Sequence, residues 1–209
     1  QEEILDIWRK TNKKAELGSG LIEHVLTKCM LNDLKDAVEL IDEAIETCKA
    51  LNDDYMLLRA EVMKGFVYVC LEQPEKALPI IEKNLPIAKR LDAQWDYYFL
   101  YHYYGDAAVM LEDYKNGEQL FGIALKAAEE SENKNQSAYE LLGIANSVSG
   151  QKRYKKALRL YAAFNQFLSD NGIGTVDVMF WRKERKKHSD NAYKALGADA
   201  NKYKEEGRQ

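Results

Sequence analysis

The chain has 209 residues, 46% of them hydrophobic and 31% charged, which is the balance of a folded domain and excludes a disordered segment. Its net charge of −4 at pH 7 argues against general attraction to nucleic acid. With 3 prolines and 12 glycines it has too few turn residues for an all-β fold, and no apolar run approaches the roughly 18 residues of a membrane span. The composition therefore predicts a helical protein.

Amphipathic helices are expected along the whole chain. Residues 1–17 are predicted to form an N-terminal helix around Trp8, and they lack the basic and apolar segments of a secretion signal. Because the first residue is not Met, we expect a piece of a longer protein. Apolar residues spaced by three and four then mark successive helices. The expected breaks between these helices are Gly18-Ser19-Gly20, Asn32-Asp33, Asn52-Asp53-Asp54, Gln73-Pro74, Asp92, Glu112-Asp113, Asn133-Lys134-Asn135, Gly150 and 169–174.

A small residue recurs with a period of 40, and it defines four repeats. The four positions are Ala37, Ala77, Gly117 and Ala157. A large side chain follows each of them by four residues, namely Ile41, Ile81, Phe121 and Tyr161. Further small residues precede three of these positions, namely Gly65, Gly105 and Gly143. The pattern predicts pairs of helices in close contact that must stack on their neighbours, because one pair cannot bury its apolar face alone.

These repeats resemble the tetratricopeptide repeat (TPR) family. The matching positions are Gly65, Tyr68 and Ala77, then Gly105, Gly117, Phe121 and Ala124, with Tyr114-Lys115 at a turn. The resemblance implies an all-α, TPR-like α-solenoid, a right-handed superhelix of antiparallel helix pairs. It implies one domain, with four helix pairs over 18–170 and C-terminal helices over 171–209. The period exceeds the family's usual value of about 34, which implies longer helices or turns.

The last third carries a narrower resemblance. The stretches 139–163 and 194–208 look like the final repeat of large bacterial regulators, the signal-transduction ATPases and their transcriptional relatives. That similarity implies a module within a larger signalling protein. Any ATPase would lie outside this chain, because no GxxxxGK[ST] motif is present.

No constellation of residues predicts catalysis, a metal or a cofactor. The three histidines lie far apart and lack the spacing of metal ligands: His24, His102 and His188. Three cysteines in apolar contexts lack a CxxC pair and indicate reduced thiols in the cytoplasm: Cys29, Cys48 and Cys70. We therefore expect a protein that is not an enzyme.

Charge is unevenly distributed along the chain. Residues 32–54 hold eight acidic and two basic side chains, whereas residues 151–188 hold ten basic and three acidic ones. The basic stretch predicts either a surface for an acidic partner or an ordinary solvated helix face, on which lysine stems cover apolar atoms.

In the resembled fold, the first helix of each pair lines a concave groove. The groove candidates, which are the predicted binding residues, are Arg59, Phe66, Phe99, His102, Asp106 and Glu140. We expect the partner to be a protein or peptide, including other domains of the same polypeptide, with a small-molecule effector or a homo-oligomer as alternatives. Neither nucleic acid nor a membrane is expected. Two alternatives stay open for the groove: its charges pair with each other, as Arg59 with Asp106, or a C-terminal helix over 176–196, anchored by Trp181, fills it. A structural adaptor without a ligand is the alternative function.

Overall fold

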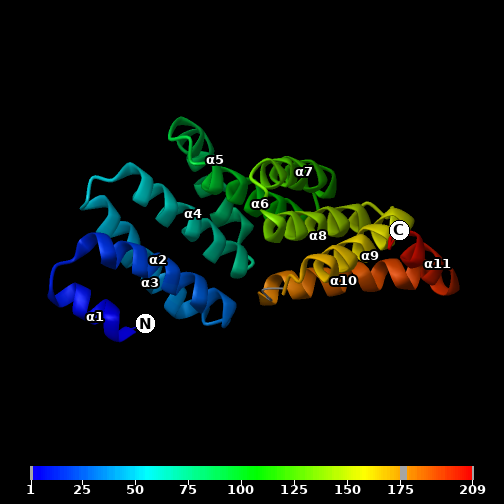
Figure 1. Cartoon of the computed structure of the whole chain (residues 1–209), viewed down its shortest axis with the longest axis horizontal. Coiled ribbons are helices and arrows are strands. Elements are labelled where there is room, and N and C mark those ends of the chain that lie inside the picture. The colour runs from blue at the N-terminus through cyan, green and yellow to red at the C-terminus, as the bar shows by residue number, and fades with distance from the viewer. Residues whose placement is uncertain (1, 175–177, 209) are drawn as a thin grey trace. The chain divides into compact units, whose positions relative to one another are not determined.

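The computed structural model describes residues 2–174 and 178–208. All regular structure in those residues is helical, which confirms the predicted all-α class (Figure 1). The α-helices are α1 (Glu2–Lys10), α2 (Lys14–Met30), α3 (Leu34–Lys49), α4 (Asp54–Cys70), α5 (Pro74–Arg90), α6 (Gln94–Met110), α7 (Tyr114–Glu130), α8 (Lys134–Gly150), α9 (Tyr154–Asn171), α10 (Met179–Leu196) and α11 (Ala200–Glu206). A 3₁₀ turn, Gly197–Asp199, joins the last two. Residues 176 and 177 of the predicted C-terminal helix lie outside the described residues.

The structure divides the 40-residue repeat into two steps of 20. Each step consists of a helix of about 17 residues and a three-residue turn, and one turn residue has a positive φ. These left-handed residues are Asn12, Asn32, Asn52, Glu72, Asp92, Glu112, Glu132 and Lys152. Since helices joined by so short a turn run antiparallel, two steps make one helix pair, and the predicted period of 40 is the period of the pair.

The turns end their helices in the same way. At the end of α2 the Asn32 N–H donates to the Cys29 carbonyl at 3.1 Å, and the Asp33 N–H donates to the Lys28 carbonyl at 2.9 Å. This is the Schellman arrangement, which satisfies carbonyls that the helix end leaves open. The same two bonds recur at Lys152 and Arg153, at 2.8 and 3.1 Å. A left-handed residue is therefore required every 20 residues, although none of these eight is glycine.

The N-terminal boundaries differ from the sequence prediction. The expected helix over 1–17 is interrupted at Asn12, and the expected break at Gly18 to Gly20 lies inside α2. Both glycines are contact points rather than turns. A Cβ on Gly20 would lie 2.4 Å from the Trp8 ring, and one on Gly18 would lie 3.1 Å from the Cys48 sulfur. Glycine at these positions allows neighbouring side chains to approach the α2 backbone.

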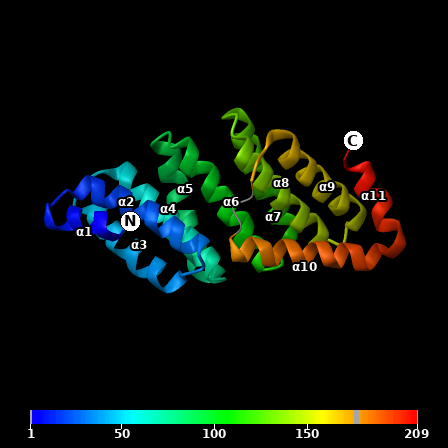
Figure 2. The ribbon, with the colours of Figure 1, turned by 60° about the horizontal axis from the view of Figure 1, so that its bottom comes forward.

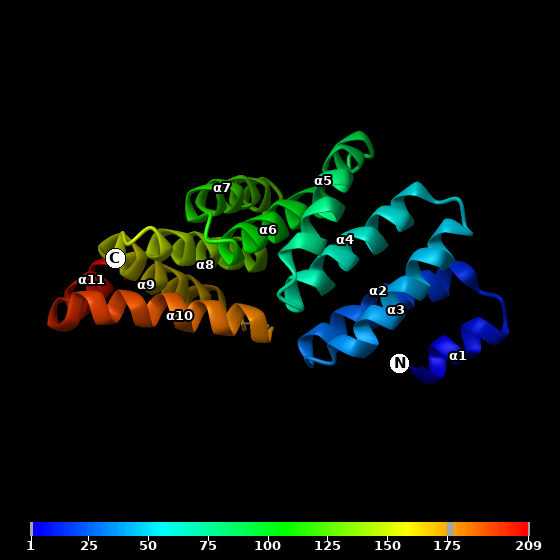
Figure 3. The ribbon, with the colours of Figure 1, turned by 180° about the vertical axis from the view of Figure 1, so that it is seen from behind.

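The chain forms two compact units, residues 1–100 and 101–209, with the boundary inside α6. In the N-terminal unit, α1 lies on α2, and α2, α3 and α4 each pack on the next helix (Figure 3). The predicted small residue Ala77 is fully buried there beside Ile81. In the C-terminal unit, α7, α8 and α9 pack in series, α10 lies against α8 and α9, and α11 lies against α9 (Figure 2). Ala157 is fully buried in that unit, as predicted.

Small residues also explain a close helix contact in the C-terminal unit. The Phe121 ring lies 2.8 Å from an ideal Cβ on Gly105 and 2.5 Å from one on Gly143. Real Cβ atoms do not come that close to ring carbons, so the ring occupies the space that two absent side chains leave free. This contact places α6, α7 and α8 around one aromatic ring and brings the polar side chains of α6 and α8 together.

Candidate functional site

The six predicted groove residues divide between the two units. Arg59, Phe66 and Phe99 belong to the N-terminal unit, and His102, Asp106 and Glu140 belong to the C-terminal unit. The six residues therefore form two separate groups of three, one in each unit.

The three C-terminal residues form a buried cluster. The His102 Nδ1 lies 2.9 Å from both carboxylate oxygens of Glu140, and its Nε2 lies 3.4 Å from Asp106 Oδ2. The Gln136 amide also donates to Glu140. Relative exposure is 3% for His102, 6% for Asp106 and 0% for Glu140. A ligand in solvent cannot contact these side chains in this conformation.

Burial and charge set the protonation of this cluster. Burial alone would lower the pKa of His102, but the carboxylates of Glu140 and Asp106 more than offset it and raise that pKa to about 9. Burial raises the pKa of Asp106 to about 6, although His102 and a hydrogen bond from Trp181 act to lower it. Near neutral pH the cluster therefore holds a cationic His102 next to Glu140 and Asp106.

Trp181 of α10 covers this cluster. Its indole N–H donates to Asp106 Oδ2 at 2.9 Å. Its ring centroid lies 5.3 Å from that of His102 in an edge-on arrangement and 5.2 Å from that of Tyr139. In this unit, a C-terminal helix of the same chain thus covers the residues that were predicted to form the groove floor. This arrangement, a helix anchored by Trp181, is one of the two alternatives to ligand binding that were predicted from the sequence.

The inner face of α10 combines apolar and polar side chains. Phe180 and Ala192 are buried, and so are Glu184 and His188, whose Nε2 lies 3.2 Å from a Glu184 carboxylate oxygen. The Ser149 hydroxyl donates to the His188 carbonyl at 2.7 Å, and the Tyr114 ring contacts the imidazole edge-on. Five basic side chains of residues 151–188 pair with acids: Arg153 and Lys156 with Glu118, Arg159 with Glu206, Lys186 with Asp190, and Lys187 with Glu184. These pairs favour the solvated-face interpretation of the basic stretch.

The N-terminal unit presents a different surface at the starts of α4 and α6. Tyr55 and Trp95 are 44% and 56% exposed, which is high for large aromatic rings. Asp96 interacts with two residues of α4. Its carboxyl group has a hydrogen bond with the Tyr55 side chain, and the positive charge of Arg59 acts to lower its pKa. The Phe99 ring lies 6.2 Å from Trp95. We call these five residues, Tyr55, Arg59, Trp95, Asp96 and Phe99, the α4–α6 shelf.

Asp96 is the buried acid of the shelf. It is only 6% exposed, and its Oδ2 atom has no hydrogen-bond partner. Burial raises the pKa of this carboxyl group, and the charge of Arg59 and the Tyr55 hydrogen bond only partly oppose that effect. Arg59 itself lies 3.5 Å from the Glu23 carboxylate. The shelf therefore contains a carboxylate whose hydrogen-bonding capacity is not filled.

Sequence reasoning found part of this shelf. Arg59 and Phe99 were predicted and lie on it, whereas Phe66 is 1% exposed and belongs to the core. Tyr55, Trp95 and Asp96 were not predicted as binding residues. Trp95 opens a run of seven aromatic residues in ten, which was the available signal, but the sequence does not tell which of the seven rings is exposed.

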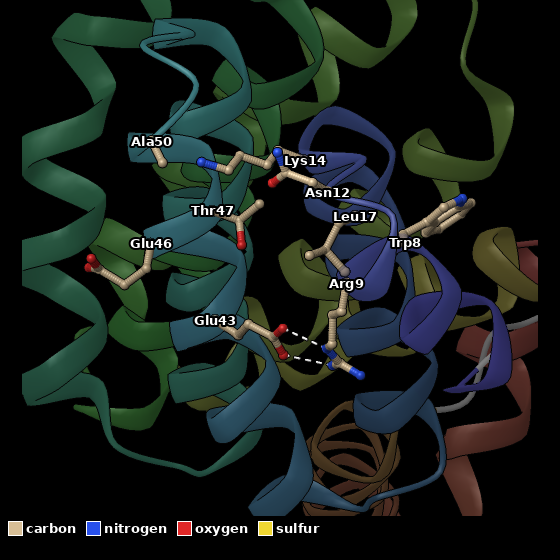
Figure 4. Close-up of a pocket in the computed structure, with 9 residues that line it drawn as sticks. All are labelled: Trp8, Arg9, Asn12, Lys14, Leu17, Glu43, Glu46, Thr47 and Ala50. Atoms are coloured by element: carbon tan, nitrogen blue, oxygen red, sulfur yellow. Dashed lines mark hydrogen bonds and ion pairs between the residues drawn. The ribbon is translucent and has the colours of Figure 1, made fainter.

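One pocket of the N-terminal unit lies between the α1–α2 turn and α3 (Figure 4). Its volume is about 360 Å³. Leu17, Thr47 and Ala50 contribute to its wall, and Arg9 faces Glu43 across one side (Figure 4). The Arg9 guanidinium donates to both Glu43 carboxylate oxygens at 2.7 Å and to Asp6 at 2.8 Å. The charge of Arg9 is therefore paired within the protein.

Within residues 2–174 and 178–208, no group of three or more His, Cys, Asp and Glu side chains is arranged to hold a metal ion. The three cysteines are buried free thiols. No helix in the same described ranges combines the length and the apolar character that crossing a membrane requires. No protein-family model matches this chain, and no curated protein matches it.

Proposed function

We propose that this chain is a TPR-type protein-interaction module that holds a segment of a partner protein on the α4–α6 shelf, and that it carries no catalytic activity of its own. In this proposal it belongs to a larger cytoplasmic regulatory or signalling protein, as the resemblance of its last third to bacterial regulators implies. The partner is another protein or another domain of the same polypeptide.

The observation that carries the proposal is the exposure of Trp95 and Tyr55 on a rigid base. Trp95 packs at 5.5 Å against Tyr98, which is 1% exposed, so the indole is held in place and yet is 56% exposed. Tryptophan, tyrosine and arginine are the residues that most often dominate binding energy at protein interfaces. The shelf combines all three, and aromatic rings held by neighbours lose little entropy when a partner binds.

A crosslinking experiment tests the proposal. A photoreactive phenylalanine analogue replaces Trp95 in the full chain, and in a control protein it replaces Ile123 of α7, which is 43% exposed in the C-terminal unit. We expect a discrete crosslinked protein at position 95 that is absent at position 123. Adding Arg59→Ala to the position-95 protein should reduce that product, because the guanidinium belongs to the same surface. Identical products at both positions, or no effect of Arg59→Ala, would contradict the shelf as an interface.

A further inference from the structure

The chemistry of the shelf indicates which class of partner segment it accepts. The N-terminal unit, residues 1–100, contains 19 acidic and 13 basic side chains, whereas residues 101–209 contain 15 acidic and 17 basic ones. The excess negative charge of the protein therefore lies in the unit that carries the shelf. An acidic unit attracts basic partners and disfavours acidic ones at the encounter stage.

A second acid lies beside the shelf. Glu23 of α2 is 3.5 Å from Arg59, so the one guanidinium of the shelf interacts with two carboxylates, those of Asp96 and Glu23. Arg59 does not fill the hydrogen-bonding capacity of Asp96, because the Asp96 Oδ2 atom is buried without a partner. A buried carboxylate oxygen in this state is costly, and a donor with a positive charge is the group that removes the cost most effectively.

The rings beside Asp96 favour the same kind of ligand. An indole attracts a cation placed over its face, and tryptophan does so more strongly than tyrosine or phenylalanine. Trp95 precedes Asp96 directly in the chain, and Tyr55 is hydrogen-bonded to it. Tyr55 is 44% exposed, and binding as inferred requires its side chain to rotate so that a ligand reaches the buried carboxylate.

We infer that the shelf recognises a basic peptide segment, with one lysine or arginine side chain of the partner seated against Trp95 and bound by the Asp96 carboxylate. This inference rests on the proposed function, since it concerns the same surface. It adds the class of partner: a positively charged stretch with neighbouring apolar residues that cover Tyr55 and Phe99.

Binding of defined peptides to the full chain tests the inference. The probes are synthetic peptides of about a dozen residues that carry arginine, glutamine or glutamate at the same positions between shared apolar residues. Titration calorimetry is run at about 0.15 M ionic strength, where attraction beyond roughly 8 Å is screened. We expect the arginine peptide to bind roughly tenfold more tightly than the glutamine peptide, and the glutamate peptide to bind most weakly.

Two variants separate the shelf from the general charge of the unit. Asp96→Asn should reduce the preference for arginine over glutamine to about twofold or less, because it removes the charge and keeps the shape. Asp42→Asn is the matched control, since Asp42 is an exposed acid of the same unit that pairs with Lys64 at 2.7 Å. It should leave the preference unchanged. Thermal unfolding of both variants shows whether each is folded, and Trp95→Ala provides a second loss-of-binding variant that leaves Asp96 in place.

The possible results give different answers. If the arginine peptide shows no advantage, through equal binding or no binding, the basic-partner inference is wrong, while a crosslink at position 95 would still support the proposed function. If Asp42→Asn lowers the preference as much as Asp96→Asn does, bulk charge explains it, and Asp96 is not the binding group. If the chain associates with itself and Trp95→Ala abolishes that association, the occupant is the basic stretch of a second copy, and the assignment to a partner protein is overturned.

Discussion

Asp106→Asn provides a quantitative test of the buried cluster in the C-terminal unit. Burial raises the pKa of Asp106 to about 6, from an ordinary value of 3.8. A carboxyl group whose pKa is higher in the folded state than in the unfolded state binds its proton more tightly when folded. The folded protein therefore loses stability through this group as the pH rises from about 3.8 to about 6, and the full loss is present above that window.

The size of the effect follows from the shift. About two pKa units at roughly 1.4 kcal/mol each give a cost of about 3 kcal/mol near pH 7 for keeping Asp106 ionised in the core. Asparagine has no charge to bury, and its amide oxygen can still accept the hydrogen bond from Trp181, which is 2.9 Å long in the wild type. We expect Asp106→Asn to be more stable than the wild type at pH 7 by roughly 2–3 kcal/mol. The difference should become small near pH 4, where Asp106 is protonated in the folded state and close to the midpoint of its titration in the unfolded state.

Urea denaturation at constant ionic strength measures this difference. Trp181 reports on the C-terminal unit when Trp8 and Trp95 are replaced by Phe in both proteins, since these are the only three tryptophans of the chain. Asp190→Asn is the control, because Asp190 is an exposed acid of the same helix α10 that pairs with Lys186. The reasoning would be refuted if Asp106→Asn destabilised the unit equally at pH 4 and pH 7. That result would mean that the substitution acts through packing or hydrogen bonding and not through the charge of Asp106.

Four further substitutions test the packing and the turns of the repeats by thermal or urea unfolding. Gly150→Ala should destabilise by about 1–3 kcal/mol, since the new Cβ would lie 2.3 Å from the Tyr114 ring, whereas Gly122→Ala, with open space around it, should be neutral or stabilise by up to about 1 kcal/mol. Glu112→Gly should stabilise by about 1 kcal/mol because φ is 61° at that turn, and equal or lower stability would show that the turn is not strained. Ala77→Leu should cost about 1–3 kcal/mol at a fully buried helix contact, and an unchanged midpoint would contradict the repeat alignment.

The sequence predicted the helical repeat because its strongest requirement is local. Two helices in close contact need a small residue at the crossing, and Ala77 and Ala157 recur at that place and are fully buried. The turns were harder to predict. A left-handed residue is usually Gly or Asn, yet Glu112 and Lys152 occupy that conformation, since the packing of two long helices fixes the turn regardless of its residue.

The binding surface was only partly predictable for a different reason. Helical register predicted His102, Asp106 and Glu140 among six groove residues, and the structure brings these three into one cluster. Register gives the face of a helix but not what covers that face. Trp181 is 75 residues away from Asp106 in the chain, so its contact depends on the tertiary packing of α10.

The 40-residue period places equivalent positions both on the surface covered by Trp181 and on the exposed α4–α6 shelf. Positions 59, 99 and 139 are equivalent in successive 40-residue repeats, and they hold Arg59, Phe99 and Tyr139. In the C-terminal unit, Tyr139 packs against Trp181, so a side chain at this position contacts an aromatic ring supplied by another segment. In the N-terminal unit, the equivalent residues Arg59 and Phe99 belong to the α4–α6 shelf, next to the exposed Trp95. Because stacked repeats present equivalent faces, a face that holds a helix of its own chain at one repeat has the geometry to hold a segment of a partner at another. The position of Trp181 is thus an internal example of the contact that we propose for the shelf.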